Sequence, residues 1–187
     1  MITLFRMTRF AIPLLVFLIL VLFFWKGLGA DPRKIPSALI NQPIPEFSLP
    51  SLENSSEKLH RSLFKGHISI LHVWATWCST CKSEHPFWVD IARNEKIPLF
   101  GLLYKDAQYS AQAWLKTHEN PYKKIIEDDS GHLAMDLGVY GTPETFLIDA
   151  DGMVRYKISG PVDERVWSQE IVPRIKLLES KTSKVEK

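Results

Sequence analysis

Residues 68–81 read Ile-Ser-Ile-Leu-His-Val-Trp-Ala-Thr-Trp-Cys-Ser-Thr-Cys, and this stretch decides the fold. Its first part, residues 68–74, is rich in β-branched and large apolar side chains, a composition typical of a buried central strand. Cys78 and Cys81 follow closely, and residues 81–94 then have the pattern of a helix that contains a proline. A C-x-x-C that joins a strand to a helix is far more informative than an isolated one. The arrangement predicts a redox-active dithiol at the start of a helix.

The two cysteines have different expected roles. The first N–H groups of a helix are unpaired and the helix dipole favours an anion, so we expect Cys78 to be the exposed, reactive thiolate. Cys81 lies one turn further in, and we expect it to be the more buried partner that attacks a mixed disulfide and releases the reduced substrate. A structural disulfide is the weaker interpretation, because a bridge between residues three apart hardly constrains the unfolded chain.

Other uses of a C-x-x-C pair fit the sequence less well. A zinc site would need two further ligands; His85 is one candidate, but no second C-x-x-C is present. Covalent haem attachment needs a histidine directly after the second cysteine, and residue 82 is Lys. We therefore predict dithiol redox chemistry with no cofactor and no resident metal. A metallochaperone that binds copper or zinc through Cys78, Cys81 and His85 remains the alternative from another class.

The chain outside this stretch alternates between strand and helix patterns. This alternation, followed by a hairpin, predicts an α/β architecture with a mixed central sheet flanked by helices. The expected strands are 46–49, 68–74, 98–103, 124–126, 145–148 and 154–158, the last two joined by turn residues 149–152; the expected helices are 81–94, 110–117 with Ser110 as its cap, 132–137, and 163–179 interrupted at Pro173.

The amino terminus predicts a membrane anchor. Residues 10–25 are sixteen consecutive apolar or proline residues, and extension through residue 30 gives a helix long enough to span a bilayer. The alternative is a cleaved secretory signal, but the apolar run is longer than a usual signal core. We expect a cytoplasmic tail at 1–9, a single transmembrane anchor at 10–30, a Pro-rich tether at 31–45, a periplasmic domain at 46–179 and a polar tail at 180–187. The basic residues flanking the apolar run do not decide its orientation.

Charge and cysteine content exclude some classes of protein. The chain has 187 residues, with 23 Lys and Arg against 21 Asp and Glu. Three of the basic residues and none of the acidic ones fall in the first 30 positions, so the remainder is close to neutral. A nucleic-acid binder normally carries a basic patch, so we expect no nucleic-acid partner. Two cysteines cannot form a multi-disulfide scaffold or a four-thiolate zinc site.

Several motifs together resemble known families. Trp77-Cys-x-x-Cys81 after an apolar strand, Pro86 in the following helix, and Gly141-Thr-Pro143 before a strand resemble the thioredoxin fold across about residues 45–178. A narrower resemblance is to the thioredoxins of cytochrome c biogenesis, the DsbE or CcmG family. It is carried by the segments 73–78, 81–85, 104–106, 114–116, 120–122 and 137–146.

This resemblance implies a function and a location. Members of the family are membrane-anchored periplasmic reductants in the bacterial inner membrane. It implies a thiol:disulfide oxidoreductase that reduces apocytochrome c, or a partner that handles its haem-binding cysteines. A membrane thiol transporter of the DsbD or CcdA type would supply the electrons. The closest alternative is an anchored reductase of the TlpA or ResA type that serves other exported proteins, and an oxidant of the DsbA kind would use the same motif in the opposite direction.

Two side chains are candidates for moving the proton of Cys81. Helical spacing places Glu84 on the stripe that holds Cys81, where a carboxylate could accept or donate a proton as the thiol changes state. His72 lies six residues before Cys78, where many thioredoxins carry a buried Asp, and a neutral imidazole could do the same work. A solvated first-turn Glu84 and a hydrogen-bonded core His72 are the simpler interpretations. Ser79 stands where the family often has Pro, which leaves the redox potential open.

The expected substrate groove lies beside the dithiol. The resemblance implies a cis bond between Thr142 and Pro143 that faces the cysteines and leaves the backbone of Thr142 free to pair with an extended substrate. Trp77 and Glu144 are then expected to border this shallow groove. The segment 105–129 is longer than a minimal connection, and the resemblance implies that it is an insert that shapes the groove.

Overall fold

The computed structural model describes residues 2–27 and 39–185, and it divides into an amino-terminal unit, Met1–Lys34, and a second unit, Ile35–Lys187. The amino-terminal unit contains helix α1, Ile2–Gly27, with Pro13 inside it, and large apolar side chains from residue 12 to residue 25 are exposed. Across the described parts of the chain, no helix meets both the length and the apolarity needed to cross a membrane. Most of the predicted tether, residues 31–38, lies outside the described residues.

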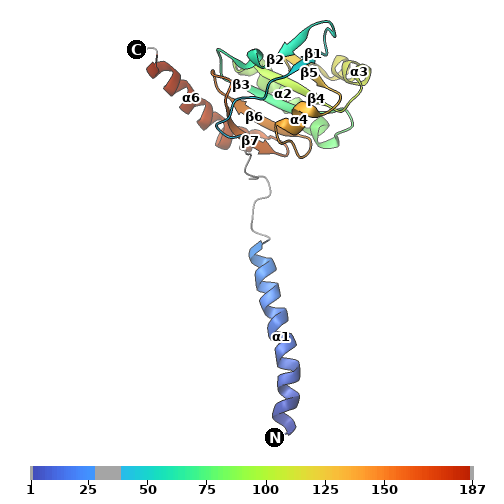
Figure 1. Ribbon diagram of the computed structural model, residues 1–187, viewed down its shortest axis with the longest axis vertical. Helices are drawn as coiled ribbons and strands as arrows, with labels where there is room; N and C mark the ends of the chain where they lie inside the picture. Colours follow the sequence, from blue (N-terminus) through green and yellow to red (C-terminus); the bar gives the residue numbers. More distant parts are fainter. Residues whose placement is uncertain (1, 28–38, 186–187) are drawn as a thin grey trace. The chain divides into compact units, whose positions relative to one another are not determined.

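The second unit is built on one five-stranded sheet with the order β5-β4-β3-β6-β7 (Figure 1). Strands β3, β4 and β5 are parallel, whereas β6 is antiparallel to β3 and β7 is antiparallel to β6. The predicted mixed sheet and the central place of the strand before the cysteines are therefore confirmed. The strand bounds are β3 Ser69–Trp74, β4 Leu99–Tyr104, β5 Lys124–Asp128, β6 Glu144–Ile148 and β7 Val154–Ser159.

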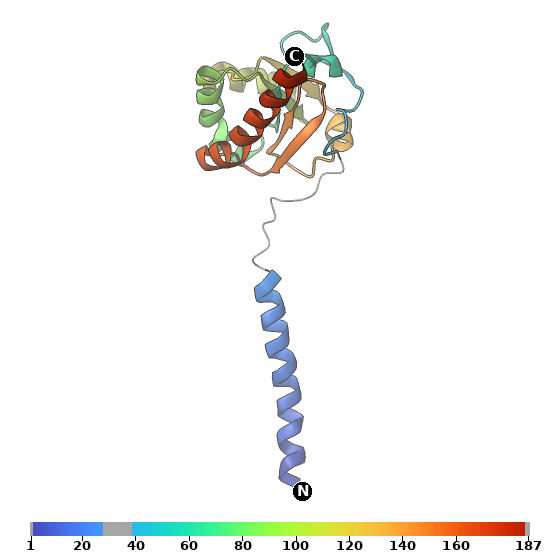
Figure 2. The same ribbon diagram turned by 90° about the vertical axis from the view of Figure 1, so that its left-hand side faces the viewer.

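Helices cover both faces of this sheet, because its central strands alternate their apolar side chains between two cores. In β3, Ile70 and Trp74 pack toward one face, whereas Leu71 and Val73 pack toward the other. The first face is covered by α2 (Ser79–Asn94), α3 (Gln108–His118), a π-helical turn η2 (Trp167–Ile171) and α6 (Val172–Val185), which crosses the sheet in dark red in Figure 2. The second face is covered by α4 (His132–Asp136), the 3-10 turn η1 (Arg61–Phe64) and the chain around Ile44.

The amino-terminal part of this unit contacts both outer strands of the sheet. Residues 41–44 bond to the start of β7: the Asn41 N–H donates to the Val154 carbonyl, and the Ile44 N–H donates to the Gly152 carbonyl. The part of the predicted tether from residue 39 to residue 45 is therefore packed on the domain. Further along, Ser51 bridges to Ile126 of β5 on the opposite edge.

A small hairpin differs from the expected pattern. Strand β1 spans Ser48–Pro50, later than the predicted 46–49, and it pairs with β2, Lys58–His60, where the sequence predicted no strand. In β2 only Leu59 is buried, so a strand of three residues gives almost no periodic signal.

Two helices also differ from expectation. Helix α3 begins at Gln108 with Ala107 at its N-cap, so the prediction that Ser110 caps it is wrong. The terminal helix begins as α5, Glu164–Val166, and its irregularity is the π-helical turn η2 directly before the turn that holds Pro173. Helix α6 continues to Val185, through most of the segment predicted to be a polar tail.

Candidate active site

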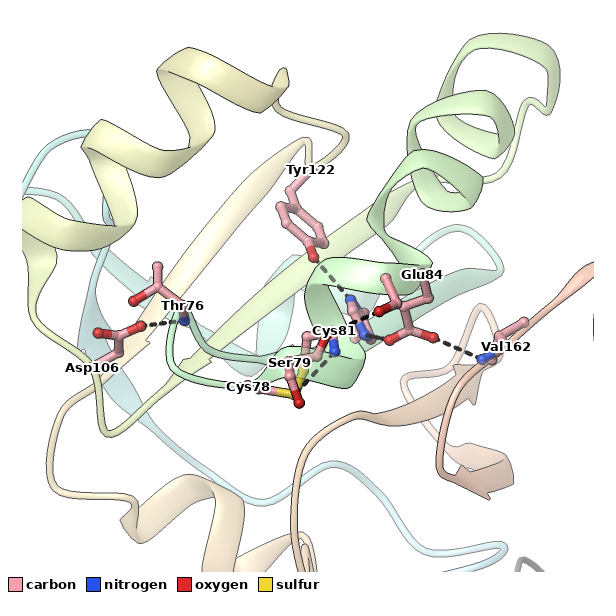
Figure 3. Close-up of a disulfide and its surroundings, with 10 residues drawn as sticks. Thr76, Cys78, Ser79, Cys81, Glu84, Asp106, Tyr122 and Val162 are labelled. Carbon is pink, nitrogen blue, oxygen red and sulfur yellow. Dashed lines mark hydrogen bonds and ion pairs between the residues drawn. A yellow bond between two sulfur atoms is a disulfide. The ribbon is translucent and has the colours of Figure 1, made fainter.

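The two cysteines lie where β3 gives way to α2 and are joined by a disulfide (Figure 3). Cys78 is the N-cap residue of α2, and the Cys81 N–H donates to its sulfur over 3.0 Å. In the reduced protein this contact would stabilise a thiolate on Cys78, because the first turn of the helix offers an unpaired N–H and a favourable dipole.

Exposure does not distinguish the two sulfurs in this oxidised state. Cys78 is 6% exposed and Cys81 is 4% exposed, so the expectation that Cys78 stands open to solvent is wrong for the disulfide form. Each cysteine covers the other when they are bonded. Their roles are distinguished instead by position, since Cys78 caps the helix and Cys81 lies within its first turn.

The loop that leads into Cys78 is held by the turn after β4. The Thr76 N–H donates to the Asp106 carboxylate, whose other oxygen accepts from the Ala107 N–H over 2.8 Å. The Trp77 indole N–H donates to the Lys105 carbonyl over 3.1 Å, while the side chain stays 57% exposed. Trp77 therefore borders the dithiol at the surface. Asp106 lies in one of the segments that carry the family resemblance, but no pattern in the sequence indicates its role.

A buried chain of hydrogen bonds lies behind Cys81. Glu84 Oε1 lies 2.9 Å from His72 Nε2, and Glu84 Oε2 accepts from the Val162 N–H over 2.7 Å. His72 Nδ1 lies 2.9 Å from the Tyr122 hydroxyl. The four groups come from α2, β3, the segment before β5 and the segment after β7; Figure 3 labels three of them, Glu84, Tyr122 and Val162.

This chain of hydrogen bonds joins Glu84 and His72, which the sequence indicated as two separate candidates for moving the Cys81 proton. Glu84 shares the buried face of α2 with Cys81 and Trp88, as helical spacing predicts. His72 and Glu84 are 1% and 6% exposed, so the interpretation of a solvated Glu84 is wrong. Burial raises the pKa of the Tyr122 hydroxyl well above its usual value, and the nearby charge of Glu84 adds to the effect. Tyr122 therefore remains a neutral phenol.

His85 is directed away from the cysteine pair. Its Nε2 bonds to the carbonyls of His118 and Glu119 at the end of α3. Burial lowers the pKa of His85, against the opposing effect of these two carbonyls. Among the residues that the structure describes, no three His, Cys, Asp or Glu side chains are grouped to hold a metal ion. The site that the metallochaperone alternative would need, built from Cys78, Cys81 and His85, is not assembled here.

The segment before β6 contains the expected proline but does not place Glu144 at the surface. The Thr142–Pro143 peptide bond is cis, as the resemblance implied. Glu144 is only 2% exposed and pairs with Lys157 of β7, with 2.9 Å between Oε2 and Nζ. The expectation that the Glu144 side chain borders the groove is therefore wrong, because this carboxylate is used internally. Thr142 is half-buried and precedes the sheet directly.

Comparison with known proteins agrees with this geometry. Residues 39–171 match the Redoxin family. The thiol:disulfide interchange protein DsbE of Pseudomonas aeruginosa is 43% identical over 162 residues, which cover 87% of this chain and 89% of that protein. The protein of the same name from Escherichia coli K12 is 43% identical over 168 residues, which cover 87% and 90%. A secreted thiol-disulfide isomerase from Corynebacterium glutamicum shares the fold alone, with a TM-score of 0.65 at 19% identity over 79% of this chain and 96% of that one.

Proposed function

The chain belongs to the Redoxin family as a thioredoxin-like thiol:disulfide interchange protein of the DsbE type, and on this premise we propose that it reduces protein disulfides in cytochrome c maturation. It is a thiol:disulfide oxidoreductase whose redox centre is Cys78 and Cys81. The observation that supports the exchange chemistry of the proposal is the buried Glu84 carboxylate on the same helix face as Cys81, because a proton acceptor there assists attack by the Cys81 sulfur.

The reaction transfers two electrons from the dithiol to the substrate. The Cys78 thiolate attacks one sulfur of the substrate disulfide, so a mixed disulfide forms and one substrate thiolate leaves. Cys81 then loses its proton, and its sulfur attacks the Cys78 sulfur. The mixed disulfide breaks, the second substrate thiolate leaves, and the Cys78–Cys81 disulfide remains. That oxidised form is the one seen here.

Glu84 acts in the second half of this reaction. Cys81 is a poor nucleophile as a thiol, and Glu84 is the buried carboxylate on its face of α2. Transfer of the Cys81 proton to Glu84 produces the thiolate at the moment when it must attack. The proton then passes to the departing substrate sulfur or to water, so the protein ends oxidised and the substrate ends as a dithiol.

Partners and location follow the same proposal. The substrate is apocytochrome c or a partner that handles its haem-binding cysteines, and a membrane thiol transporter of the DsbD or CcdA type returns the dithiol to its reduced form. The apolar run at 10–25 supports attachment of residues 10–30 to the bilayer. We place the catalytic domain in the periplasm because protein disulfides belong to an oxidising compartment. Attachment raises the effective concentration of the dithiol near membrane partners.

Trapping the mixed disulfide tests the proposal. In Cys81→Ser, Cys78 should capture an oxidised peptide that carries the C-x-x-C-H haem-binding motif, and the adduct should persist on a non-reducing gel. Cys78→Ser is the matched control and should capture nothing. Preference for this peptide over a C-x-x-C peptide without the histidine supports the cytochrome role, whereas equal capture favours a general reductase of the TlpA or ResA type. Loss of bound copper or zinc in Cys81→Ser without any adduct would instead indicate a metallochaperone.

The direction of electron flow has its own test. The reduction potential of the full-length protein in detergent can be followed by tryptophan fluorescence, because Trp77 lies next to the dithiol. A potential near or below about −200 mV supports a reductant that needs an electron supply, whereas one near about −120 mV is that of an oxidant and contradicts the proposal.

A further inference from the structure

We propose that Tyr122 is a positioning residue for the exchange reaction, because it orients His72 so that His72 holds the Glu84 carboxylate beside Cys81. The inference rests on the proton-accepting role proposed above for Glu84. It assigns His72 to holding Glu84 in place and not to accepting the proton of Cys81.

The positions of the hydrogens follow from the partners. The buried phenol of Tyr122 keeps its proton and has to donate it, and the acceptor at 2.9 Å is His72 Nδ1. A neutral imidazole that accepts at Nδ1 carries its hydrogen on Nε2. That N–H points at Glu84 Oε1, 2.9 Å away. Tyr122 therefore selects the tautomer of His72 that can donate to Glu84.

Both oxygens of Glu84 then accept hydrogen bonds. Oε1 accepts from His72, and Oε2 accepts from the Val162 N–H over 2.7 Å. Two donors from different elements fix the plane of the carboxylate. Each oxygen has a second lone pair, so the carboxylate remains able to take up a proton from Cys81.

The packing around His72 keeps this arrangement rigid. The His72 ring lies 5.1 Å from the ring of Trp88 and 6.0 Å from that of Tyr122. Trp74 stacks on Tyr122, with 5.4 Å between the ring centroids. These apolar ring faces leave His72 to find its partners in Tyr122 and Glu84, so its two nitrogens are both used.

The residue opposite His72 in the sheet explains how Tyr122 reaches it. His72 pairs with Gly101 of β4. A Cβ at Gly101 would lie 3.1 Å from Cγ of Tyr122 and 2.9 Å from Nε1 of Trp74, so a side chain there would push both rings away. Because Gly101 has no side chain, the Tyr122 ring can pack against β4 and its hydroxyl can reach His72.

Nuclear magnetic resonance of the imidazole nitrogens tests the orientation directly. In the reduced full-length protein in detergent, the nitrogen shifts of His72 should be those of the tautomer with hydrogen on Nε2 and none on Nδ1. In Tyr122→Phe, Nδ1 loses its donor, so His72 should no longer be held in that tautomer and its nitrogen shifts should change. The titratable groups that face the pair of His72 and Glu84 are Tyr122, from the segment before β5, and Cys81 and His85, both on α2. The segment after β7 contributes the backbone N–H of Val162. An unchanged His72 spectrum in Tyr122→Phe would overturn the proposal.

The rate of resolution gives the second readout. A mixed disulfide between Cys78 and thionitrobenzoate releases its coloured thiolate when Cys81 attacks, so single turnovers can be followed by absorbance. Tyr122→Phe should slow this release by about fivefold, the loss expected from one hydrogen bond in the chain.

Two more variants separate this inference from the proposed role of Glu84. Glu84→Gln should slow release more than Tyr122→Phe at every pH. If Glu84→Gln is slow and Tyr122→Phe matches the wild type, the role of Glu84 stands and the positioning role of Tyr122 fails. If Glu84→Gln is also unchanged, the proton role of Glu84 fails. Gly101→Ala keeps every titratable group but displaces the Tyr122 ring, so it should reproduce the His72 spectrum of Tyr122→Phe; a wild-type spectrum would count against the proposal.

Discussion

Replacement of Lys157 by methionine should destabilise the domain far more than loss of a surface lysine does. The Lys157 and Glu144 side chains are 2% and 3% exposed, with 2.9 Å between Nζ and Oε2. Lys157 Nζ also donates to the Gly138 carbonyl over 2.7 Å. Lys157→Met keeps the length and apolar character of the side chain but leaves the Glu144 carboxylate buried without its cation.

The size of the loss follows from the contacts that remain. Removal of one partner of a buried ion pair costs about 3–5 kcal/mol. Glu144 Oε1 would still accept from the Tyr140 N–H and the Ser159 hydroxyl, at 3.3 and 3.1 Å, so we expect the lower end, about 3 kcal/mol. For a domain of this size that corresponds to a fall of roughly 6–12 °C in Tm.

Urea unfolding of the oxidised full-length protein in detergent, followed by tryptophan fluorescence, measures this loss. Lys124→Met is the matched control, because Lys124 and Glu57 form an ion pair with 2.7 Å between Nζ and Oε2 and with side chains 34% and 39% exposed. Loss of such an exposed pair should cost less than about 1 kcal/mol. The double variant Lys157→Met, Glu144→Gln buries no charge and should recover much of the stability.

Two results would refute this reasoning. Equal losses in Lys157→Met and Lys124→Met would mean that burial of the pair has no energetic consequence. A double variant less stable than Lys157→Met would mean that the isolated Glu144 carboxylate is not the source of the cost.

Two further predictions follow from other contacts of the site. Asp106→Ala should cost about 3 kcal/mol in the same urea measurement, because it leaves the N–H groups of Thr76 and Ala107 without their acceptor; a loss under about 1 kcal/mol would show that neither bond matters. Burial lowers the pKa of His85, so the unfolded chain takes up the proton first and stability is lost as pH falls through about 6.5. His85→Gln should therefore show a smaller drop in urea midpoint between about pH 7.5 and 5.5 than the wild type; an equal drop would assign the acid sensitivity to other groups.

The sequence was a good guide to the parts of the fold that depend on local pattern. The run of β-branched and apolar residues before the cysteines is the central strand β3, and the next strands and the last hairpin lie within a residue or two of their predicted bounds. These elements are buried and periodic, so their composition reflects their environment. The stripe of α2 that holds Cys81 and Glu84 was predictable for the same reason, since helical spacing alone puts them on one face.

What the sequence missed depends on contacts between distant residues. Asp106 lies directly before the N-cap of α3 and accepts from the N–H of Thr76, which is 30 residues away in the sequence. Glu144 was expected at the surface, yet its carboxylate is buried and forms an ion pair with Lys157, thirteen residues later in the adjacent strand. Tyr122 lies 50 residues from His72, and no local pattern relates a phenol in an irregular segment to an imidazole in a strand. Such pairs become visible only when the sheet order is known.

The contacts of residues 41–52 with both outer strands of the sheet affect how copies of the chain can associate. Outer strands offer unpaired backbone groups that invite another chain to add to the sheet. Here residues 41–44 occupy such groups at the start of β7, and residues 51–52 do so on β5. This one segment of about a dozen residues thus bonds to both edge strands of the sheet, β7 and β5. A chain without this segment would present two open edges, and its first defect would be aggregation, even with the redox centre intact.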